Sequence, residues 1–193
     1  MKIKNFTNKW DKIYEKKQCS DTIVCPALAN NTHLLPNKGK ALDLASGLGG
    51  NAILLARLGL DVEAWDISNT ALKKLYDHAK SEKLNIKTVH RDSEQYPPEK
   101  NTFDVIAVSY FLHRPTFQDL LCALKKEGLL FYQTFIKEKT SEVGPTNPKY
   151  LLETNELLNL CQGMEILVYR EEGKQGDIQK GLRNQALIVA KKI

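Results

Sequence analysis

Three aspartates stand at or near the ends of three successive short apolar runs, and a glycine-rich turn follows the first of them. Asp43 lies in the segment ALDLASGLGGNA, Asp66 ends the segment VEAWD, and Asp92 is followed directly by Ser93. Glycines let a backbone come close to a bound ligand. Carboxylates accept hydrogen bonds from hydroxyl and amino groups and balance a positive charge. The spacing therefore predicts a site for a small polar ligand, if one edge of the fold brings the three runs together.

The elements that would position these residues alternate between short apolar runs and longer amphipathic segments. Continuous apolar runs predict buried strands, and apolar residues at helical spacing predict helices. This alternation is typical of an open α/β sheet, in which the carboxyl ends of the parallel strands meet near a ligand site. Strands are expected at residues 40–44, 61–65, 86–90, 103–109, 128–135, 165–169 and 185–190, and helices at 51–60, 70–83, 116–126 and 153–161.

Two classes of adenosine-containing cofactor use such a strand–turn–helix unit. Gly47, Gly49 and Ala52 satisfy the loose dinucleotide fingerprint G-x-G-x-x-A. The alternative is S-adenosylmethionine (SAM), which has no phosphate. The carboxylate of Asp43 would repel a pyrophosphate but would attract the ammonium group of SAM, so it favours SAM over NAD. Asp43 could otherwise only cap the following loop. Asp66 would accept hydrogen bonds from ribose hydroxyls in either class.

The chain resembles the class I SAM-dependent methyltransferases, most closely the small tellurite-resistance-type and thiopurine-methyltransferase-like enzymes. The segments ALDLASGLGG, VEAWDIS, HRDSEQYP and FDVIAVSYFLHR carry the resemblance in that order, and it extends from about Asn8 to the C-terminus. It implies a Rossmann-like, seven-stranded, mostly parallel sheet with helices on both faces and the last strand antiparallel. It also implies SAM as cofactor, S-adenosylhomocysteine as product and no metal.

The resemblance assigns a role to each matching position around the cofactor. Asp43 would hold the methionine amino group, and Gly47 and Gly49 would pass under the methionine and the ribose. Ala45 stands where the motif often opens with glycine, and a methyl group fits there if φ stays negative. The other cofactor positions would be Asp66 on the ribose, Ile67, Asp92 and Ser93 at the adenine, Ser109 at the methionine end, and Trp10 and Tyr14 over the cofactor.

The stretch after the fourth predicted strand would border the methyl group. His113 could act as a general base or substrate ligand, or simply cap a helix. Arg114 could hold a carboxylate or phosphate of the substrate, or lie on the surface. The loop at residues 136–150 would hang over the site, or be an ordinary surface loop. The predicted catalytic residues are His113, Tyr14 and Arg183, and the predicted substrate residues are Tyr110, Arg114, Phe135 and Tyr150.

The basic charge of the chain lies at its ends. The 193 residues carry a formal net charge of +5. Residues 1–17 hold six lysines against two acidic residues, Lys191 and Lys192 add two charges, and residues 18–190 sum to −1. The body thus offers no positive face to continue a nucleic-acid track. Residues 1–35 are expected to form a lid segment within a single domain that spans residues 1–193.

The cysteines and the hydropathy pattern indicate in which cellular compartment the protein is expected. Cys19, Cys25, Cys122 and Cys161 lack the short spacing of zinc or redox sites, which predicts free thiols in a reducing environment. The N-terminus has no apolar core of a secretory signal, and no stretch of about 20 residues lacks charge. A cytoplasmic protein without metal or membrane contact is expected.

These observations together predict a SAM-dependent methyltransferase that acts on a small-molecule substrate. The alternatives are an RNA methyltransferase, an NAD-dependent oxidoreductase and a non-catalytic SAM-binding protein. The expected assembly is a monomer or a weak homodimer.

Overall fold

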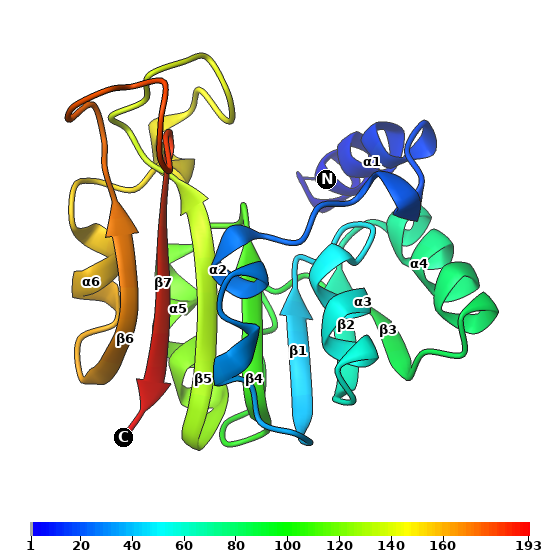
Figure 1. Cartoon of the computed structure of the whole chain (residues 1–193). Helices are drawn as coiled ribbons and strands as arrows, with labels where there is room; N and C mark the ends of the chain where they lie inside the picture. Colours follow the sequence, from blue (N-terminus) through cyan, green and yellow to red (C-terminus); the bar gives the residue numbers. More distant parts are fainter. Residues whose placement is uncertain (1) are drawn as a thin grey trace.

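The computed structural model describes the backbone of residues 2–193 and the side chains of residues 7–193. Seven strands form one sheet in the order β3-β2-β1-β4-β5-β7-β6 (Figure 1). β7 runs antiparallel to both of its neighbours, and the other six strands are parallel to one another. The predicted Rossmann-like topology with an antiparallel last strand is therefore confirmed. The strands are β1 (Lys40–Leu44), β2 (Asp61–Asp66), β3 (Ile86–His90), β4 (Phe103–Ser109), β5 (Leu124–Phe135), β6 (Met164–Glu171) and β7 (Gln185–Lys192).

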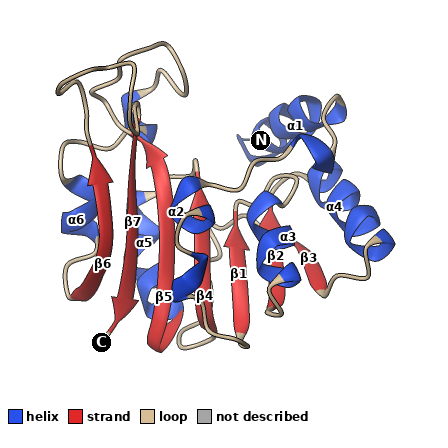
Figure 2. Ribbon diagram, viewed as in Figure 1, coloured by secondary structure: helices blue, strands red, loops and turns tan. Residues whose placement is uncertain are grey.

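Helices cover both faces of the sheet (Figure 2). One core layer joins the sheet to α2, α3 and α4, and the other joins it to α5 and α6. The helices are α1 (Lys2–Glu15), α2 (Pro26–Ala29), α3 (Gly50–Arg57), α4 (Asn69–Ser81), α5 (Phe117–Ala123) and α6 (Glu156–Leu160), with 3₁₀ turns at Cys19–Asp21, Thr32–Leu34, Arg114–Thr116 and Pro148–Tyr150. No helix among the described residues is long and apolar enough to cross a membrane.

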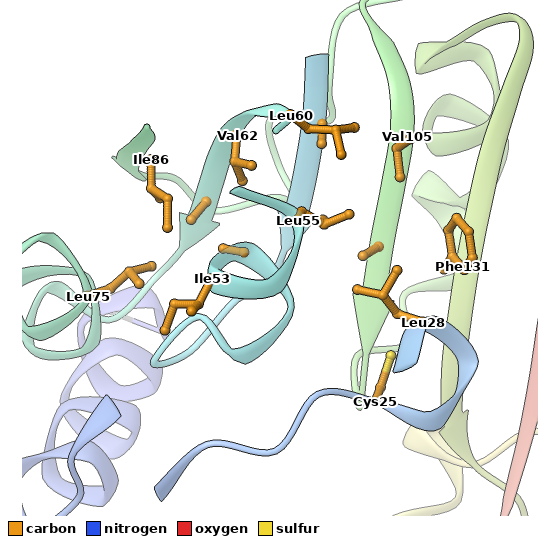
Figure 3. Packing of buried hydrophobic residues seen from close by; sticks show 14 of the residues in the cluster. Cys25, Leu28, Ile53, Leu55, Leu60, Val62, Leu75, Ile86, Val105 and Phe131 are labelled. Atoms are coloured by element: carbon orange, nitrogen blue, oxygen red, sulfur yellow. The ribbon is translucent and has the colours of Figure 1, made fainter. Parts of the chain in front are cut away.

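β4 shows why the centre of the sheet is a rigid platform. Val105, Ile106, Ala107 and Val108 are all fully buried, because side chains on both faces of this central strand meet a helical layer. Figure 3 shows one of these layers, in which Leu28, Ile53, Leu55 and Phe131 converge from three helices or strands. The carboxyl ends of β1 and β4 are therefore held firmly beside each other.

The start of β5 differs from the prediction. The sequence LKKEG predicted a helix up to residue 126, but α5 ends at Ala123 and β5 begins at Leu124. Leu124 is fully buried and pairs with Phe103, and the register then shifts by a bulge. Glu127 adopts a φ of 65° within this bulge. Burial of one leucine thus outweighs the helical pattern of its polar neighbours.

Segments distant in sequence gather beyond the carboxyl ends of the parallel strands. Figure 1 shows α1 at this edge on the side of α4. The loop at residues 136–150 and the connection between β6 and β7 extend beyond the same edge on the side of β5 and β7. A ligand bound at the ends of β1 and β4 would lie between these two sets of segments.

Candidate cofactor site and substrate cleft

Asp43 lies fully buried beneath the glycine-rich turn, next to the carboxyl end of β1. Its Oδ2 accepts a hydrogen bond from the Ala52 N–H at 2.9 Å, and its Oδ1 accepts one from Asn51 Nδ2 at 3.2 Å. Burial raises the pKa of the carboxyl to about 7, although both hydrogen bonds oppose the rise. Asp43 thus holds the first turn of α3 in place, which is the structural role that the sequence offered as the alternative to ligand binding. Each of its oxygens still keeps a lone pair for a further donor.

Asn51, which the sequence interpretation missed, connects three parts of the site. Its Nδ2 lies 3.2 Å from Asp43 Oδ1 and 3.1 Å from Ser109 Oγ at the end of β4. Its Oδ1 accepts a hydrogen bond from the Cys25 N–H at 3.1 Å. Because the side chain is buried, these contacts fix the turn, β4 and the N-terminal segment relative to one another. The available signal was its place directly after the glycine pair.

Asp66 binds the backbone of the same turn from the end of β2. Its Oδ2 accepts a hydrogen bond from the Gly47 N–H at 2.7 Å, and its Oδ1 accepts one from the Ser68 N–H at 2.8 Å. Burial raises the pKa of the Asp66 carboxyl, against the effect of these hydrogen bonds. Two buried carboxylates with raised pKa values therefore lie at this edge, and both would be stabilised by a positive charge between them.

Gly47 and Gly49, which the sequence predicted to lie beside a ligand, face different neighbours in the protein. A Cβ on Gly47, whose φ is 53°, would lie 2.5 Å from the hydroxyl oxygen of Tyr14. A Cβ on Gly49, whose φ is 79°, would lie 2.4 Å from Cδ1 of Leu75 in α4. The missing side chain of Gly49 thus makes room for the packing of α4, and its predicted backbone contact with the cofactor stays a prediction. The missing side chain of Gly47 makes room for the Tyr14 hydroxyl of α1.

Ala45 also departs from its expectation. Its φ is 56°, in the left-handed region, so the condition of a negative φ is not met. For alanine this conformation brings Cβ close to the following carbonyl oxygen. Ala45 therefore shapes the turn at a cost in strain that a glycine would not incur.

Ala45→Gly is expected to raise the free energy of unfolding by about 0.5–1 kcal/mol, because glycine adopts this φ without strain, although it adds entropy to the unfolded chain. Urea denaturation measures the change. The control is Ala52→Gly inside α3, which should lower the free energy of unfolding by at least about 0.5–1 kcal/mol. A destabilised Ala45→Gly protein would contradict the assigned strain.

Tyr14 reaches from α1 into the turn. Its hydroxyl covers Gly47, and its pKa is raised by burial and by the nearby carboxylates of Asp66 and Asp43. Trp10 stacks on the outer side of Tyr14, with ring centroids 6.0 Å apart, and its side chain is exposed. The structure thus places Tyr14 as the inner residue of the predicted lid and Trp10 as its outer residue.

α1 and α4 cap each other at opposite ends. Asp11 Oδ1 accepts hydrogen bonds from Ser68 Oγ at 2.6 Å and from the Thr70 N–H at 3.0 Å, at the start of α4. Burial raises the pKa of Asp11, but these hydrogen bonds outweigh that effect and lower it overall. Lys74 Nζ donates to the carbonyls of Tyr14, Glu15 and Lys17 at the end of α1. The negative Asp11 therefore lies at the positive N-terminal end of the α4 dipole, and the positive Lys74 lies at the negative C-terminal end of the α1 dipole. Both arrangements are favourable.

Lys74→Met is expected to speed amide hydrogen exchange in residues 2–15 by at least about tenfold, because charge-assisted hydrogen bonds contribute about 1.5–3 kcal/mol. Lys73→Met is the matched control, since Lys73 pairs with Asp77 on the exposed face of α4. Exchange followed by mass spectrometry should separate the two variants. Equal rates in both would show that Lys74 does not hold α1.

The segment after β3 forms a turn in which a side chain hydrogen-bonds to the backbone. Asp92 Oδ1 accepts a hydrogen bond from the Glu94 N–H at 3.0 Å. Ser93 and His113 line a small hollow with apolar residues of β1 and α5. Ile67 is half-buried, and its carbonyl accepts a hydrogen bond from His90 Nε2 at 3.0 Å. Ile67 thus follows the carboxyl end of β2, Asp92 and Ser93 follow that of β3, and their contact with adenine stays a prediction.

His113 and Arg114 have structural partners. His113 Nδ1 lies 2.9 Å from Thr116 Oγ1, and its ring lines the small hollow, outside the larger cleft described below. The guanidinium of Arg114 binds both carboxylate oxygens of Glu156. It also donates to the carbonyls on either side of Tyr150, which fixes the 3₁₀ turn there. Four of its five N–H groups are thus used, so Arg114 organises the loop and does not offer an anion site. This corrects its predicted role.

A cleft of about 560 Å³ opens on the β5 and β7 side of the site. Tyr110, which directly follows Ser109, forms part of its wall, and its ring lies 5.1 Å from that of Phe135. Gly144 of the loop at residues 136–150 also lies against the ring of Phe135. The lining consists of Ile23, Pro26, Tyr110, Thr140, Ser141, Ile178, Gln179, Gly181, Leu182, Arg183, Asn184 and Gln185. Tyr150 is exposed and lies outside this lining.

Arg183 lines the cleft, but its guanidinium is occupied. It donates to the carbonyls of Gly173, Gln175, Asp177 and Lys180, and Glu172 Oε2 lies 3.8 Å from its Nε. These contacts shape the connection between β6 and β7. The structure therefore gives Arg183 a role in building the cleft in place of the predicted catalytic role.

Comparison with known proteins identifies the segment that carries the turn and the three aspartates. Residues 41–128 match the sequence model of a family described as "Methyltransferase domain". The matched segment runs from β1 to the bulge in β5, so it holds Asp43, Asp66 and Asp92 but not the β6–β7 connection.

A curated protein and several solved structures are similar to this chain. The chain is 29% identical over 120 residues to "Putative methyltransferase YqeM" of Bacillus subtilis, and the match covers 58% of this chain and about half, 48%, of that protein. The fold is similar to that of TehB from Haemophilus influenzae, with a TM-score of 0.72, 23% identity, and coverage of 95% of this chain and 67% of that chain. It is also similar to a SAM-dependent methyltransferase from Aquifex aeolicus, with a TM-score of 0.67, 15% identity, and coverage of 97% and 98%. The predicted family resemblance is thereby confirmed.

Proposed function

We propose that the chain transfers the methyl group of SAM to a small molecule bound in the cleft beside Tyr110. The observation that carries the proposal is that the candidate cofactor site and the cleft adjoin each other. Asp43, Asn51 and Ser109 form one hydrogen-bonded cluster at the strand ends, and the residue after Ser109 lines the cleft. A cofactor held over this cluster would therefore face a substrate in the cleft.

The residues of the turn fit SAM. Ser46 Oγ is buried and has no hydrogen-bond partner among the described residues, so it can bind a polar group of a ligand. A Cβ at Gly47 would fill the space beside the turn that the hydroxyl of Tyr14 now occupies. The buried carboxylates of Asp43 and Asp66 suit a cationic ligand and disfavour a pyrophosphate, which argues against the NAD-dependent alternative.

The proposed roles follow the positions of the side chains. Asp43 would bind the methionine amino group, Asp66 the ribose, and Ser109 the methionine end. Ile67, Asp92 and Ser93 would contact the adenine. Tyr14 would cover the ligand as the inner residue of the lid, with Trp10 stacked outside it, as in the contact that the structure shows.

Bound SAM supplies an electrophilic methyl group, so the protein's task is alignment and exclusion of water. α1 would exclude water, because Asp11 and Lys74 hold it against α4. The cleft lining contains no histidine, carboxylate or lysine side chain among the described residues. The acceptor would therefore supply a nucleophile that needs no enzymatic base. Because the lining also lacks unpaired positive charge, a nucleic-acid acceptor is disfavoured.

A screen for transfer of labelled methyl groups tests this function directly. Purified full-length protein is incubated with methyl-labelled SAM and separate pools of thiols, amines, phenols, carboxylates and RNA. The proposal predicts label in a small-molecule pool and none in RNA. Label in RNA alone would establish the RNA methyltransferase alternative, and SAM binding without label in any pool would favour a binding protein.

A further inference from the structure

The segment that carries Asp92 and Ser93 has little packing of its own. It connects β3, an edge strand of the sheet, to β4, and residues 91–102 contain no helix. Asp92 and Ser93 are half-buried, and the three residues after them are exposed. A connection of this kind is expected to be mobile unless side chains hold it. Residues that recognise a base by hydrogen bonds need a fixed backbone, so a contact that holds this turn would decide how well it binds.

Arg91 supplies such a contact from the first position after β3. Its Nε donates to the carbonyl of Tyr96 at 2.8 Å, and its Nη2 donates to the carbonyl of Pro97 at 2.7 Å. Inside the same loop, the carbonyl of Asp92 accepts hydrogen bonds from the N–H groups of Gln95 at 3.2 Å and Tyr96 at 2.9 Å. The side chain of Arg91 therefore ties the two ends of the turn together.

The guanidinium of Arg91 also lies on a buried part of the sheet. Its Cζ stands 4.1 Å from the centroid of the Trp65 ring, a distance at which a cation and an indole attract each other. Trp65 is buried, and its Nε1 donates to Oε2 of Glu63 at 2.9 Å. The Arg91 N–H donates to the carbonyl of Asp66 at 2.9 Å. Arg91 thus connects the turn to the strand end that carries Asp66.

The turn that Arg91 holds presents an acceptor and a donor on adjacent residues. Oδ1 of Asp92 accepts from the Glu94 N–H. Among the described residues, Oδ2 of Asp92 and the N–H of Ser93 have no hydrogen-bond partner. The Watson–Crick edge of adenine offers an amino donor and a ring-nitrogen acceptor on neighbouring atoms, so it complements this pair. Hypoxanthine offers a carbonyl and an N–H there, so it does not.

We propose that Arg91 is a positioning residue for recognition of the adenine base. It does not touch the base; it holds the turn on Trp65, so that Asp92 and Ser93 meet the amino group and the ring nitrogen together. A lysine would keep the charge of Arg91 but not its flat stacking surface and its fork of donors. The inference rests on the proposed function and names a residue that sets base specificity at the same cofactor site.

S-Adenosylhomocysteine and S-inosylhomocysteine test this recognition, because they differ only at that edge of the purine. Each is titrated into the full-length protein by isothermal calorimetry. The wild type is expected to bind the adenosyl compound at least about tenfold more tightly, since the inosyl compound loses a hydrogen bond to a charged group. Arg91→Met and Arg91→Lys should both reduce this ratio of affinities to less than about threefold.

A double-mutant cycle shows whether Arg91 acts through Asp92. Asp92→Asn keeps an oxygen for the Glu94 N–H but removes the acceptor at Oδ2, so the preference for the adenosyl compound should disappear. Adding Arg91→Met to this variant should change the ratio by less than about twofold, because the contact that Arg91 positions is already lost. A merely structural role of Arg91 would weaken the binding of both compounds equally and leave the ratio unchanged.

Arg57→Met is the matched control. Arg57 pairs with Glu82 at the C-terminal ends of α3 and α4, at the opposite edge of the sheet from the turn, so this variant should keep the full ratio. Three results would each overturn the inference: a wild type that binds both compounds equally, a full ratio in Arg91→Met, or an undiminished effect of Arg91→Met in the Asp92→Asn protein.

The same titrations and the screen for methyl transfer separate the two proposals. If the wild type prefers the adenosyl compound and Arg91→Met keeps that preference, the inference about Arg91 alone fails. If the preference depends on Arg91 but no acceptor receives a methyl group, the methyltransferase proposal fails and the inference stands. If the wild type binds neither compound, both fail.

Discussion

Asp43→Asn is expected to weaken SAM binding by about 10- to 100-fold, because it removes a charge-assisted hydrogen bond of about 1.5–3 kcal/mol. The free energy of unfolding of the SAM-free protein should change by less than about 1 kcal/mol at pH 8. The variant loses one hydrogen bond with Asn51, but it no longer buries a charge. Affinity by calorimetry and stability by urea denaturation are measured on the same protein.

The pH dependence gives this variant a second signature. The pKa of Asp43 is raised by burial to about 7, so the SAM-free protein holds this proton more tightly than the unfolded chain does. The contribution of Asp43 to stability is therefore greatest below about pH 4 and falls as the pH rises to about 7. A bound ammonium favours the ionised carboxylate, so SAM affinity should rise with pH up to about 7. It should fall again near pH 8, where an α-amino group loses its proton. Asp43→Asn should lack the rising limb.

The control for this substitution is Asp104→Asn. Asp104 accepts hydrogen bonds from the Lys40 N–H and from Lys125 Nζ near the start of β4, at the opposite edge of the sheet. Its replacement should lower stability and leave SAM affinity unchanged. If Asp43→Asn bound SAM with wild-type affinity and pH dependence, Asp43 would have only its structural role at the start of α3.

Gly49→Ala is expected to lower the free energy of unfolding by about 2–4 kcal/mol. The new Cβ would lie 2.4 Å from Cδ1 and 2.5 Å from Cδ2 of Leu75, so α4 must shift or Leu75 must leave its rotamer. The φ of 79° adds the strain of a left-handed alanine. For a chain of this size the melting temperature should fall by roughly 5–15 °C.

The control for packing is Gly163→Ala, because Gly163 has a φ of 88° but nothing within 4 Å of its Cβ position. This variant should show the backbone strain alone, about 1–2 kcal/mol. Calorimetric melting of both variants compares them. Equal losses would show that Leu75 adapts freely and that the glycine serves only the turn.

The strand pattern was predictable because buried strands leave a local signal. β1, β3 and β4 have the predicted bounds, since each is an apolar or alternating run bounded by polar residues. The positions of Asp43 and Asp66 followed from the same signal, because each lies at a strand end. The start of β5 did not follow, since it depends on a single long-range pair between Leu124 and Phe103.

The missed and corrected residues share a physical cause. Asn51, Gln133 and Asp11 find their partners across long stretches of sequence, up to 106 residues between Ala27 and Gln133. A single sequence does not show such pairings. Arg114 and Arg183 were assigned to ligands because arginine binds anions, but backbone carbonyls and Glu156 or Glu172 occupy them. These partners also become visible only once the loops are placed.

Titration of SAM into the full-length protein by isothermal calorimetry tests the central claim most directly, with NAD titrated in parallel. The proposed site predicts saturable binding of one SAM per chain, weakened in Asp43→Asn, together with no measurable binding of NAD. Saturable NAD binding without SAM binding would contradict the proposed cofactor site and the methyl transfer that depends on it.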